Sequence, residues 1–132
     1  MAAKSNRIVG KYARMWPREM FDHGGKIAKD LDFLKLSGVY VLYNNEHPHY
    51  IGQATSLLDR LTAHARPQSK YYSFWNLFSA FAVSDPEGRN ELEAILIAAM
   101  PTANSAKPKL DKMLLPPKVI KLMKKIRDSK IS

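Results

Sequence analysis

The sequence predicts an α/β domain in which a small three-stranded antiparallel sheet is flanked by helices. Short runs rich in β-branched and aromatic residues alternate with turn-forming residues, as expected of strands. Other segments place their apolar residues at helical spacing. With 132 residues, of which 45% are hydrophobic and 25% charged, the chain has the size and composition of one ordinary globular domain.

The first two predicted strands cover residues 39–43 and 49–51. The asparagine-rich turn between them predicts an antiparallel hairpin. If its loop is centred near Asn45, Tyr40 faces Tyr50 across the hairpin, and both phenols lie on one face of the sheet. The third predicted strand covers 77–84, and the Asp-Pro-Glu-Gly sequence that follows it predicts a turn.

Three helices complete the predicted fold. Ser56 is a suitable N-cap for a helix that ends near residue 65, and Asp59 can complete a capping box. Residues 90–100 form a helix that is apolar almost all round, which predicts that it is buried. After a proline-containing linker, residues 118–131 form a basic amphipathic helix.

We expect this fold to be organised in three segments. Residues 1–35 are an N-terminal extension and a candidate accessory contact for nucleic acid, because residues 7–20 mix basic and aromatic side chains. Residues 36–106 contain the predicted sheet and its first two helices. Residues 107–132 contain the linker and the basic helix.

The net charge of +9 is concentrated at the C-terminal end. Residues 107–132 hold nine Lys or Arg and two Asp, which leaves +7 in that segment. Clustered positive charge favours a polyanion through counterion release, which predicts a nucleic-acid partner. The alternative interpretation is a solubilising helix face.

Composition excludes several other classes of site. The chain has no cysteine, so disulfides, thiolate zinc sites and thiol nucleophiles are excluded. The N-terminus lacks the apolar core of a signal peptide, and the longest apolar run, residues 94–100, is too short to span a membrane. The sequence therefore predicts a cytoplasmic protein without a membrane partner.

Six polar side chains stand at defined intervals along this pattern. They are Tyr40 in Gly38-Val39-Tyr40, Tyr50 in Tyr50-Ile51-Gly52, Arg60, His64, Glu93 and Asn104. Arg60 and His64 are four residues apart and share one face of their helix. Two phenols, a guanidinium, an imidazole, a carboxylate and an amide suit metal-assisted hydrolysis of a phosphodiester.

Glu93 is the residue that a purely structural role explains least well. A carboxylate on the same helix face as Leu96 and Ile97 is costly to bury unless it is paired or binds a cation. A hard divalent cation is one suitable partner, and Arg60 is another. Glu91 points to nearly the opposite side of the helix. Periodicity alone does not decide which of the two glutamates is exposed and which is the metal ligand.

The content, order and spacing of these motifs resemble the GIY-YIG nuclease family over about residues 36–106. The resemblance implies that Tyr40 is the general base or proton relay for an attacking water and that Tyr50 positions that water and the scissile phosphate. It implies that Arg60 binds the phosphate, that His64 is a hydrogen-bond partner or proton shuttle, that Glu93 holds one Mg²⁺ or Mn²⁺, and that Asn104 braces the site. Glu93 is preferred to Glu91 because apolar residues follow it three and four places on.

Six further residues are candidates for binding the substrate. They are Gly52, which would allow a close backbone approach, Gln53, and Lys118, Lys121, Lys124 and Lys125 of the basic helix. Gln53 departs from the family pattern, because many members carry Lys at that position. No helix-hairpin-helix, zinc module or second nuclease domain accompanies the motifs.

The resemblance implies a metal-dependent endonuclease, for which DNA is favoured over RNA as the substrate and the sequence alone does not decide between them. One site cuts one strand, so double-strand cleavage requires a homodimer or two successive events. A second hypothesis is a catalytically inactive nucleic-acid-binding module, favoured by the basic tail and by Gln53. A third is a protein-interaction domain that uses the apolar side of the 118–131 helix, although that side is expected to pack on its own domain.

Overall fold

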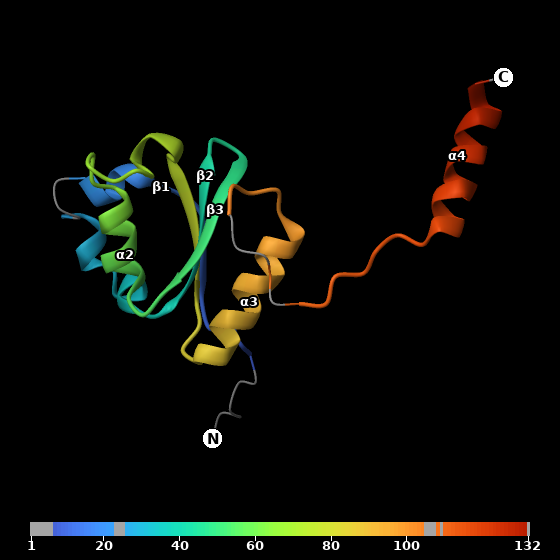
Figure 1. Ribbon diagram of the computed structural model, residues 1–132. Helices are drawn as coiled ribbons and strands as arrows, with labels where there is room; N and C mark the ends of the chain where they lie inside the picture. Colours follow the sequence, from blue (N-terminus) through green and yellow to red (C-terminus); the bar gives the residue numbers. More distant parts are fainter. Residues whose placement is uncertain (1–6, 23–25, 105–107, 109, 132) are drawn as a thin grey trace.

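The computed structural model describes residues 7–22, 26–104, 108 and 110–131. Its centre is an antiparallel sheet of four strands in the order β1-β4-β2-β3 (Figure 1). The strands are β1 (Tyr12–Pro17), β2 (Gly38–Asn44), β3 (His47–Ala54) and β4 (Leu77–Ala82). The predicted α/β fold is confirmed, but the sheet has four strands and not three.

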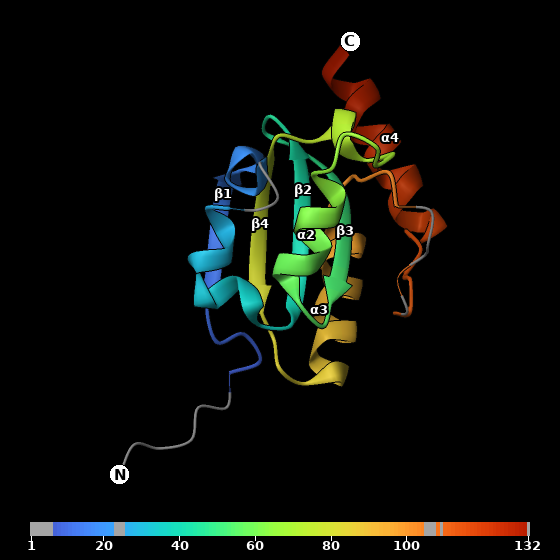
Figure 2. The ribbon, with the colours of Figure 1, turned by 90° about the vertical axis from the view of Figure 1, so that its left-hand side faces the viewer.

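Helices cover both faces of this sheet. On one face lie α2 (Leu57–His64) and short 3₁₀ turns, and on the other lies α3 (Pro86–Ala99), as Figures 1 and 2 show. The 3₁₀ turns are η1 (Arg18–Phe21), η2 (Ala28–Asp30), η3 (Asp32–Lys35) and η4 (Tyr72–Phe74). The basic helix α4 (Pro117–Ile131) projects away from the body of the molecule.

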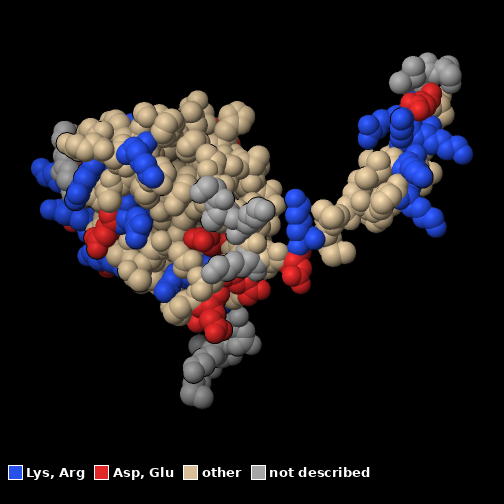
Figure 3. Space-filling view, viewed as in Figure 1, with Lys and Arg blue, Asp and Glu red and all other residues tan. Residues whose placement is uncertain are grey.

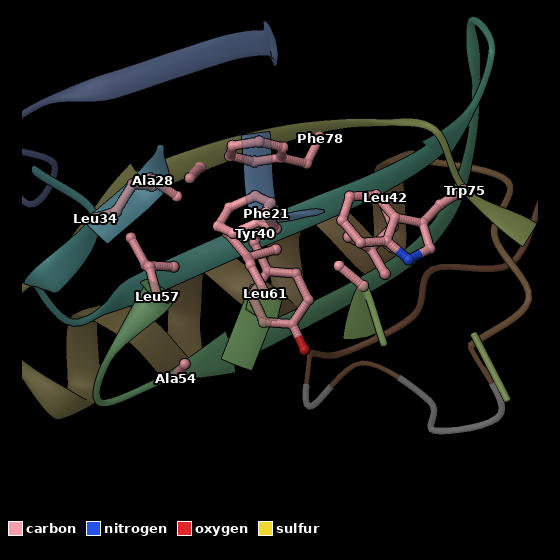
Figure 4. Close-up of a cluster of buried hydrophobic side chains, with 12 residues drawn as sticks. Phe21, Ala28, Leu34, Tyr40, Leu42, Ala54, Leu57, Leu61, Trp75 and Phe78 are labelled. Atoms are coloured by element: carbon pink, nitrogen blue, oxygen red, sulfur yellow. The ribbon is translucent and has the colours of Figure 1, made fainter. Parts of the chain in front are cut away.

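The larger core lies between the sheet and α2. Tyr40, Leu42 and Phe78 point from the strands towards Leu57 and Leu61 of the helix, and all five side chains are buried (Figure 4). The opposite face of β2 packs against α3 in a second cluster built on Val39, Val41 and Ile51. Because β2 is buried on both faces, its sequence is almost continuously apolar. Tyr40 is therefore fixed in position by core packing.

The additional strand β1 lies at the edge of the sheet beside β4. Its pairing register shifts between Ala13 and Trp16, and Met15 in that interval has a positive φ of 56°. This irregularity breaks the alternation of buried and exposed residues by which a strand is recognised in a sequence. Trp16 packs edge-on against Phe33 and Phe78, so this aromatic residue of the N-terminal segment belongs to the core.

The predicted turn after β4 is instead the beginning of α3. The side chain of Asp85 caps the helix by accepting a hydrogen bond from the Gly88 N–H, and Pro86 occupies the first turn. Asp at the N-cap followed by Pro is a favourable helix start, so the same residues that suggest a turn here extend the helix. The helix is also not buried all round, because Glu91 and Ile95 face solvent.

The apolar side of α4 does not pack on its own domain, contrary to the expectation from its sequence. Val119, Leu122, Met123 and Ile126 remain between 38% and 57% exposed. Figure 3 shows Lys and Arg side chains along the same helix. Both the apolar and the basic sides of α4 are therefore available to a partner.

The hairpin of β2 and β3 pairs its residues differently from the prediction. Tyr40 is opposite Gly52, and Tyr50 is opposite Leu42. The register shifts between Leu42 and Tyr43, which leaves His49 as an extra residue in β3. A shift of one residue exchanges the two faces of a strand. Through this bulge, Tyr50 lies on the same face of the sheet as Tyr40.

Candidate active site

The first element of the site is the phenol of Tyr40 and the imidazole of His64. The Tyr40 Oη and the His64 Nε2 are hydrogen-bonded at 2.8 Å, from β2 to the last residue of α2. Gly52 lies beneath the Tyr40 ring, and an added Cβ there would lie 2.6 Å from Cζ and closer still to the hydroxyl oxygen. Gly52 therefore permits the close approach of the Tyr40 ring to the backbone of β3.

Tyr50 and a residue that the sequence analysis missed, Tyr71, complete the aromatic part of the site. The ring centroids of Tyr50 and Tyr71 are 4.9 Å apart, and Tyr71 stands edge-on to His64 at 4.7 Å. Burial raises the pKa of Tyr50, and the Tyr71 phenol adds to that rise. The sequence signal for Tyr71 was its place in a run of aromatic and basic residues, Lys70 to Trp75, but this run has no regular spacing from the other motifs.

Arg60 and Glu93 place opposite charges beside the two phenols. Burial raises the pKa of Tyr40 well above its ordinary value, the Arg60 charge partly opposes that rise, and the Glu93 charge adds to it. The pKa of Tyr50 is raised by burial first and then by Tyr71 and Glu93. A charge that acts on both phenols lies near both of them. Both hydroxyls are therefore protonated at neutral pH.

These electrostatic effects separate Glu93 from Glu91. Glu93 is half-buried and its charge raises the pKa of both phenols, whereas Glu91 is exposed. These observations favour Glu93 as the candidate carboxylate of the site.

Asn104 lies against the outer edge of β3. Its Oδ1 accepts a hydrogen bond from the Ile51 N–H at 2.9 Å, and its Nδ2 donates to the Ile51 carbonyl at 2.8 Å. The Ala103 N–H donates to the His49 carbonyl in the same way. These bonds satisfy an edge strand that would otherwise be open, and they hold the backbone between Tyr50 and Gly52.

The other predicted substrate-binding residues lie apart from this cluster. The Gln53 amide donates to the Asn90 side chain at 2.8 Å and so points towards α3. Lys118, Lys121, Lys124 and Lys125 belong to α4, which is remote from the sheet in Figure 1. The structure thus brings together Tyr40, Tyr50, Arg60, His64 and Glu93, with Asn104 beside them, and leaves the basic tail separate.

The site is an open surface and not a deep cavity. The hollow beside Arg60 has a volume of about 160 Å³ and is also lined by Thr55, Ser56 and Asp59. Larger hollows of about 370 and 600 Å³ lie elsewhere, next to Arg66 and along α3 respectively. A shallow site is suited to a polymeric substrate, which cannot be enclosed. Of the candidate site residues, Arg60 lines the small hollow.

The donor set fits a magnesium-type ion. The described residues contain no cluster of three or more His, Asp or Glu side chains able to hold a metal, so Glu93 would be the main protein ligand. Mg²⁺ retains several waters and is commonly bound by one or two carboxylates together with substrate phosphates. A carboxylate in the same cluster as an exposed arginine is compatible with that requirement.

Burial lowers the pKa of His64 to about 4, and the Arg60 charge contributes to the decrease. Because the pKa in the folded state lies below the ordinary value of 6.5, the unfolded chain binds a proton more readily between these values. The contribution of His64 to stability is therefore complete above pH 6.5 and is lost as the pH falls towards 4.

We expect the free energy of unfolding to decrease by roughly 3 kcal/mol over that interval because of His64 alone. Urea unfolding at several pH values would measure it. His64→Gln should remove this part of the pH dependence, and His47→Gln, at an exposed position, should leave it. Identical pH dependences for the wild type and His64→Gln would contradict the assignment.

Comparison with known proteins agrees with this geometry. Residues 36–112 match the GIY-YIG catalytic domain family, and the chain belongs to that family. Comparison with curated proteins gives no match. In the described residues, none of the helices is long and apolar enough to cross a membrane.

Solved structures of the GIY-YIG N-terminal endonuclease domain of UvrC from Thermotoga maritima are similar to part of the chain. The magnesium-bound domain is 31% identical, with a TM-score of 0.46, over 55% of this chain and 88% of that one. Two point mutants of the same domain, bound to the catalytic divalent cation, are 31% and 29% identical and cover 55% of this chain and 87% of theirs, also with TM-scores of 0.46. The family assignment here rests on the match over residues 36–112.

Proposed function

We propose that this protein is a metal-dependent endonuclease that hydrolyses phosphodiester bonds in DNA. The observation that carries the proposal is the convergence of two protonated phenols, a neutral imidazole, a guanidinium and a carboxylate at one open edge of the sheet. A GIY-YIG catalytic domain indicates nuclease chemistry in general. The choice of DNA and the roles of the individual residues are our proposal.

In this mechanism Tyr40 is a proton relay. A protonated phenol is a poor base by itself, but its hydroxyl is 2.8 Å from the Nε2 of His64, which is neutral above pH 4. As Tyr40 takes a proton from the attacking water, it passes its own proton to His64, whose Nδ1 then carries the other hydrogen. Tyr50, whose ring packs against Tyr71, positions the water and the phosphate.

Arg60 and Glu93 act on the charge of the phosphate. The Arg60 guanidinium is exposed beside the phenols and would bind the scissile phosphate and stabilise the negative charge that develops on it. Glu93 would hold Mg²⁺ or Mn²⁺. When bound, such an ion polarises the phosphate and stabilises the leaving oxygen. The lysines of α4 would add sequence-independent contacts to the DNA backbone.

Cleavage of labelled single- and double-stranded DNA with Mg²⁺, Mn²⁺ or EDTA tests the proposal. We expect cutting that requires the metal and stops in EDTA. Binding that weakens with salt, without cutting of any DNA form, would overturn the proposal in favour of an inactive nucleic-acid-binding module. A further reaction with RNA would show whether the choice of DNA is correct.

A second candidate function is self-association through α4. Val119, Leu122, Met123 and Ile126 recur at spacings of three, four and seven residues and form one exposed apolar stripe. The four lysines named above lie on the other side of the helix, so a second copy could pack on the stripe while the lysines remain free. A homodimer of this kind would bring two active sites to one DNA duplex.

We expect the full chain to form dimers that Leu122→Ser combined with Met123→Ser converts to monomers, because the double substitution removes the centre of the stripe. Sedimentation equilibrium would measure the molar mass. Lys121→Ala, on the polar side, should leave the dimer intact and serves as the control. A full chain that stays monomeric over the concentration range would exclude this interface.

A further inference from the structure

The loop between α2 and β4 combines aromatic and basic side chains beside the proposed active site. Arg66 and Lys70 are exposed, and the Lys70 ammonium is 5.1 Å from the centre of the Tyr71 ring. Three residues further on, Phe74 is 48% exposed, which is unusual for a side chain of this size next to a core. Figure 2 shows the loop at the top of the view, at the end of the sheet where β3 begins.

The exposed ring of Phe74 is stacked on His49. Their centroids are 5.1 Å apart and their planes differ by 22°. His49 is the extra residue of the β3 bulge and directly precedes Tyr50. The pairs His49–Phe74 and Tyr50–Tyr71 are therefore neighbours, and an aromatic surface continues from the catalytic phenols to Phe74.

This surface is held in place by contacts from distant parts of the chain. The Arg18 guanidinium donates hydrogen bonds to the carbonyls of Tyr72 and Trp75, and it also lies 4.1 Å from the centre of the Tyr72 ring. The Trp75 indole N–H donates to the His64 carbonyl at 3.2 Å. Because the loop is fixed on both sides of Phe74, little conformational entropy is lost when a ligand stacks on that ring.

We propose that Phe74, supported by His49, is a stacking platform for an unpaired DNA base next to the scissile phosphate. Base–aromatic stacking is strong and independent of sequence, and basic side chains nearby attract the backbone. In a duplex the base faces are covered by their neighbours, so the platform favours DNA with unpaired nucleotides at the cleavage site. This inference rests on the proposed nuclease function and specifies its substrate.

Cleavage of two matched DNAs tests the platform. One is a continuous duplex, and in the other the same phosphate is flanked by unpaired nucleotides. We expect the wild type to prefer the second, Phe74→Leu to lose at least about fivefold of that preference, and Phe74→Trp to keep it. Leu retains the apolar contact without the ring, so it separates stacking from packing. An unchanged preference in Phe74→Leu would overturn the proposal.

A binding measurement separates the platform from catalysis. In EDTA, fluorescence of a single strand that contains 2-aminopurine reports stacking without cutting. The wild type and Phe74→Trp should change the fluorescence and bind at least about fivefold more tightly than Phe74→Leu, while all three bind duplex equally. This result without cleavage in Mg²⁺ would reject the nuclease and retain the platform. Equal binding of the single strand by all three proteins would reject the platform. So would a Phe74→Leu protein whose binding to duplex weakens as much as its binding to the single strand.

Discussion

Glu93→Gln should reduce the rate of DNA cleavage in Mg²⁺ by roughly a thousandfold. The amide has nearly the shape of the carboxylate and fits the same half-buried position on α3, but it lacks the charge that holds a divalent cation. Single-turnover cleavage at saturating enzyme measures the chemical step directly. DNA binding should persist, because the substitution removes a negative charge from a site that receives a phosphate.

Glu91→Gln provides the matched control. It makes the same chemical change two residues earlier on the same helix, at an exposed position. We expect cleavage and stability to be unchanged in this variant. Full activity of Glu93→Gln, or loss of activity in Glu91→Gln, would show that the metal ligand has been assigned to the wrong residue.

The hairpin shows how far sequence patterns determine such a site. Alternation in β2 and β3 correctly predicted that Tyr40 and Tyr50 share a face. The pairing itself was wrong, because Tyr40 lies opposite Gly52. Two features together produce this register, a loop between Asn44 and His47 and the extra residue His49. A bulge has no dependable sequence signal, because the contacts that stabilise it come from elsewhere in the fold.

Tyr71 illustrates the same limit for a functional residue. Tyr40, Tyr50, Arg60, His64 and Glu93 belong to strands and helices, so their spacing in the sequence can be recognised. Tyr71 belongs to a loop. The residues that follow it are held by hydrogen bonds from Arg18 to the Tyr72 and Trp75 carbonyls and from Trp75 to the His64 carbonyl. Contacts of this kind are visible only once the chain is folded.

At the two ends of the chain, the sequence predicted helix α4 but neither its position nor strand β1. The helix of residues 118–131 follows from local periodicity, and α4 indeed covers Pro117–Ile131. The position of α4 relative to the sheet cannot be predicted in the same way. An amphipathic stripe indicates that the helix packs against a partner, but it does not identify that partner. Strand β1 was missed because the irregular register at Met15 interrupts its alternation.

Tyr40→Phe should lower the cleavage rate by roughly 10²- to 10⁴-fold, the usual contribution of a general acid or base. The ring is only 1% exposed and remains packed between β3 and α2, so the fold is retained. What is lost is the hydroxyl between the attacking water and His64. Loss of one buried hydrogen bond should decrease the free energy of unfolding by about 1 kcal/mol.

Tyr43→Phe is the control for that loss, because it removes a phenol from the same strand. The Tyr43 hydroxyl donates to the Ser79 hydroxyl at 3.0 Å, and Tyr43 packs on the opposite face of the sheet. Its stability should fall by a similar amount while cleavage continues at the wild-type rate. Full activity of Tyr40→Phe would exclude the relay.

The relay also predicts how Tyr40 and His64 interact. If one proton passes through both groups, then Tyr40→Phe combined with His64→Gln should be no slower than the more damaged single variant. Residues that act independently would multiply their effects instead. The double-mutant cycle therefore distinguishes a shared proton path from two side chains that merely lie within hydrogen-bond distance. Additive losses would leave Tyr40 as a catalytic group and His64 as its structural support.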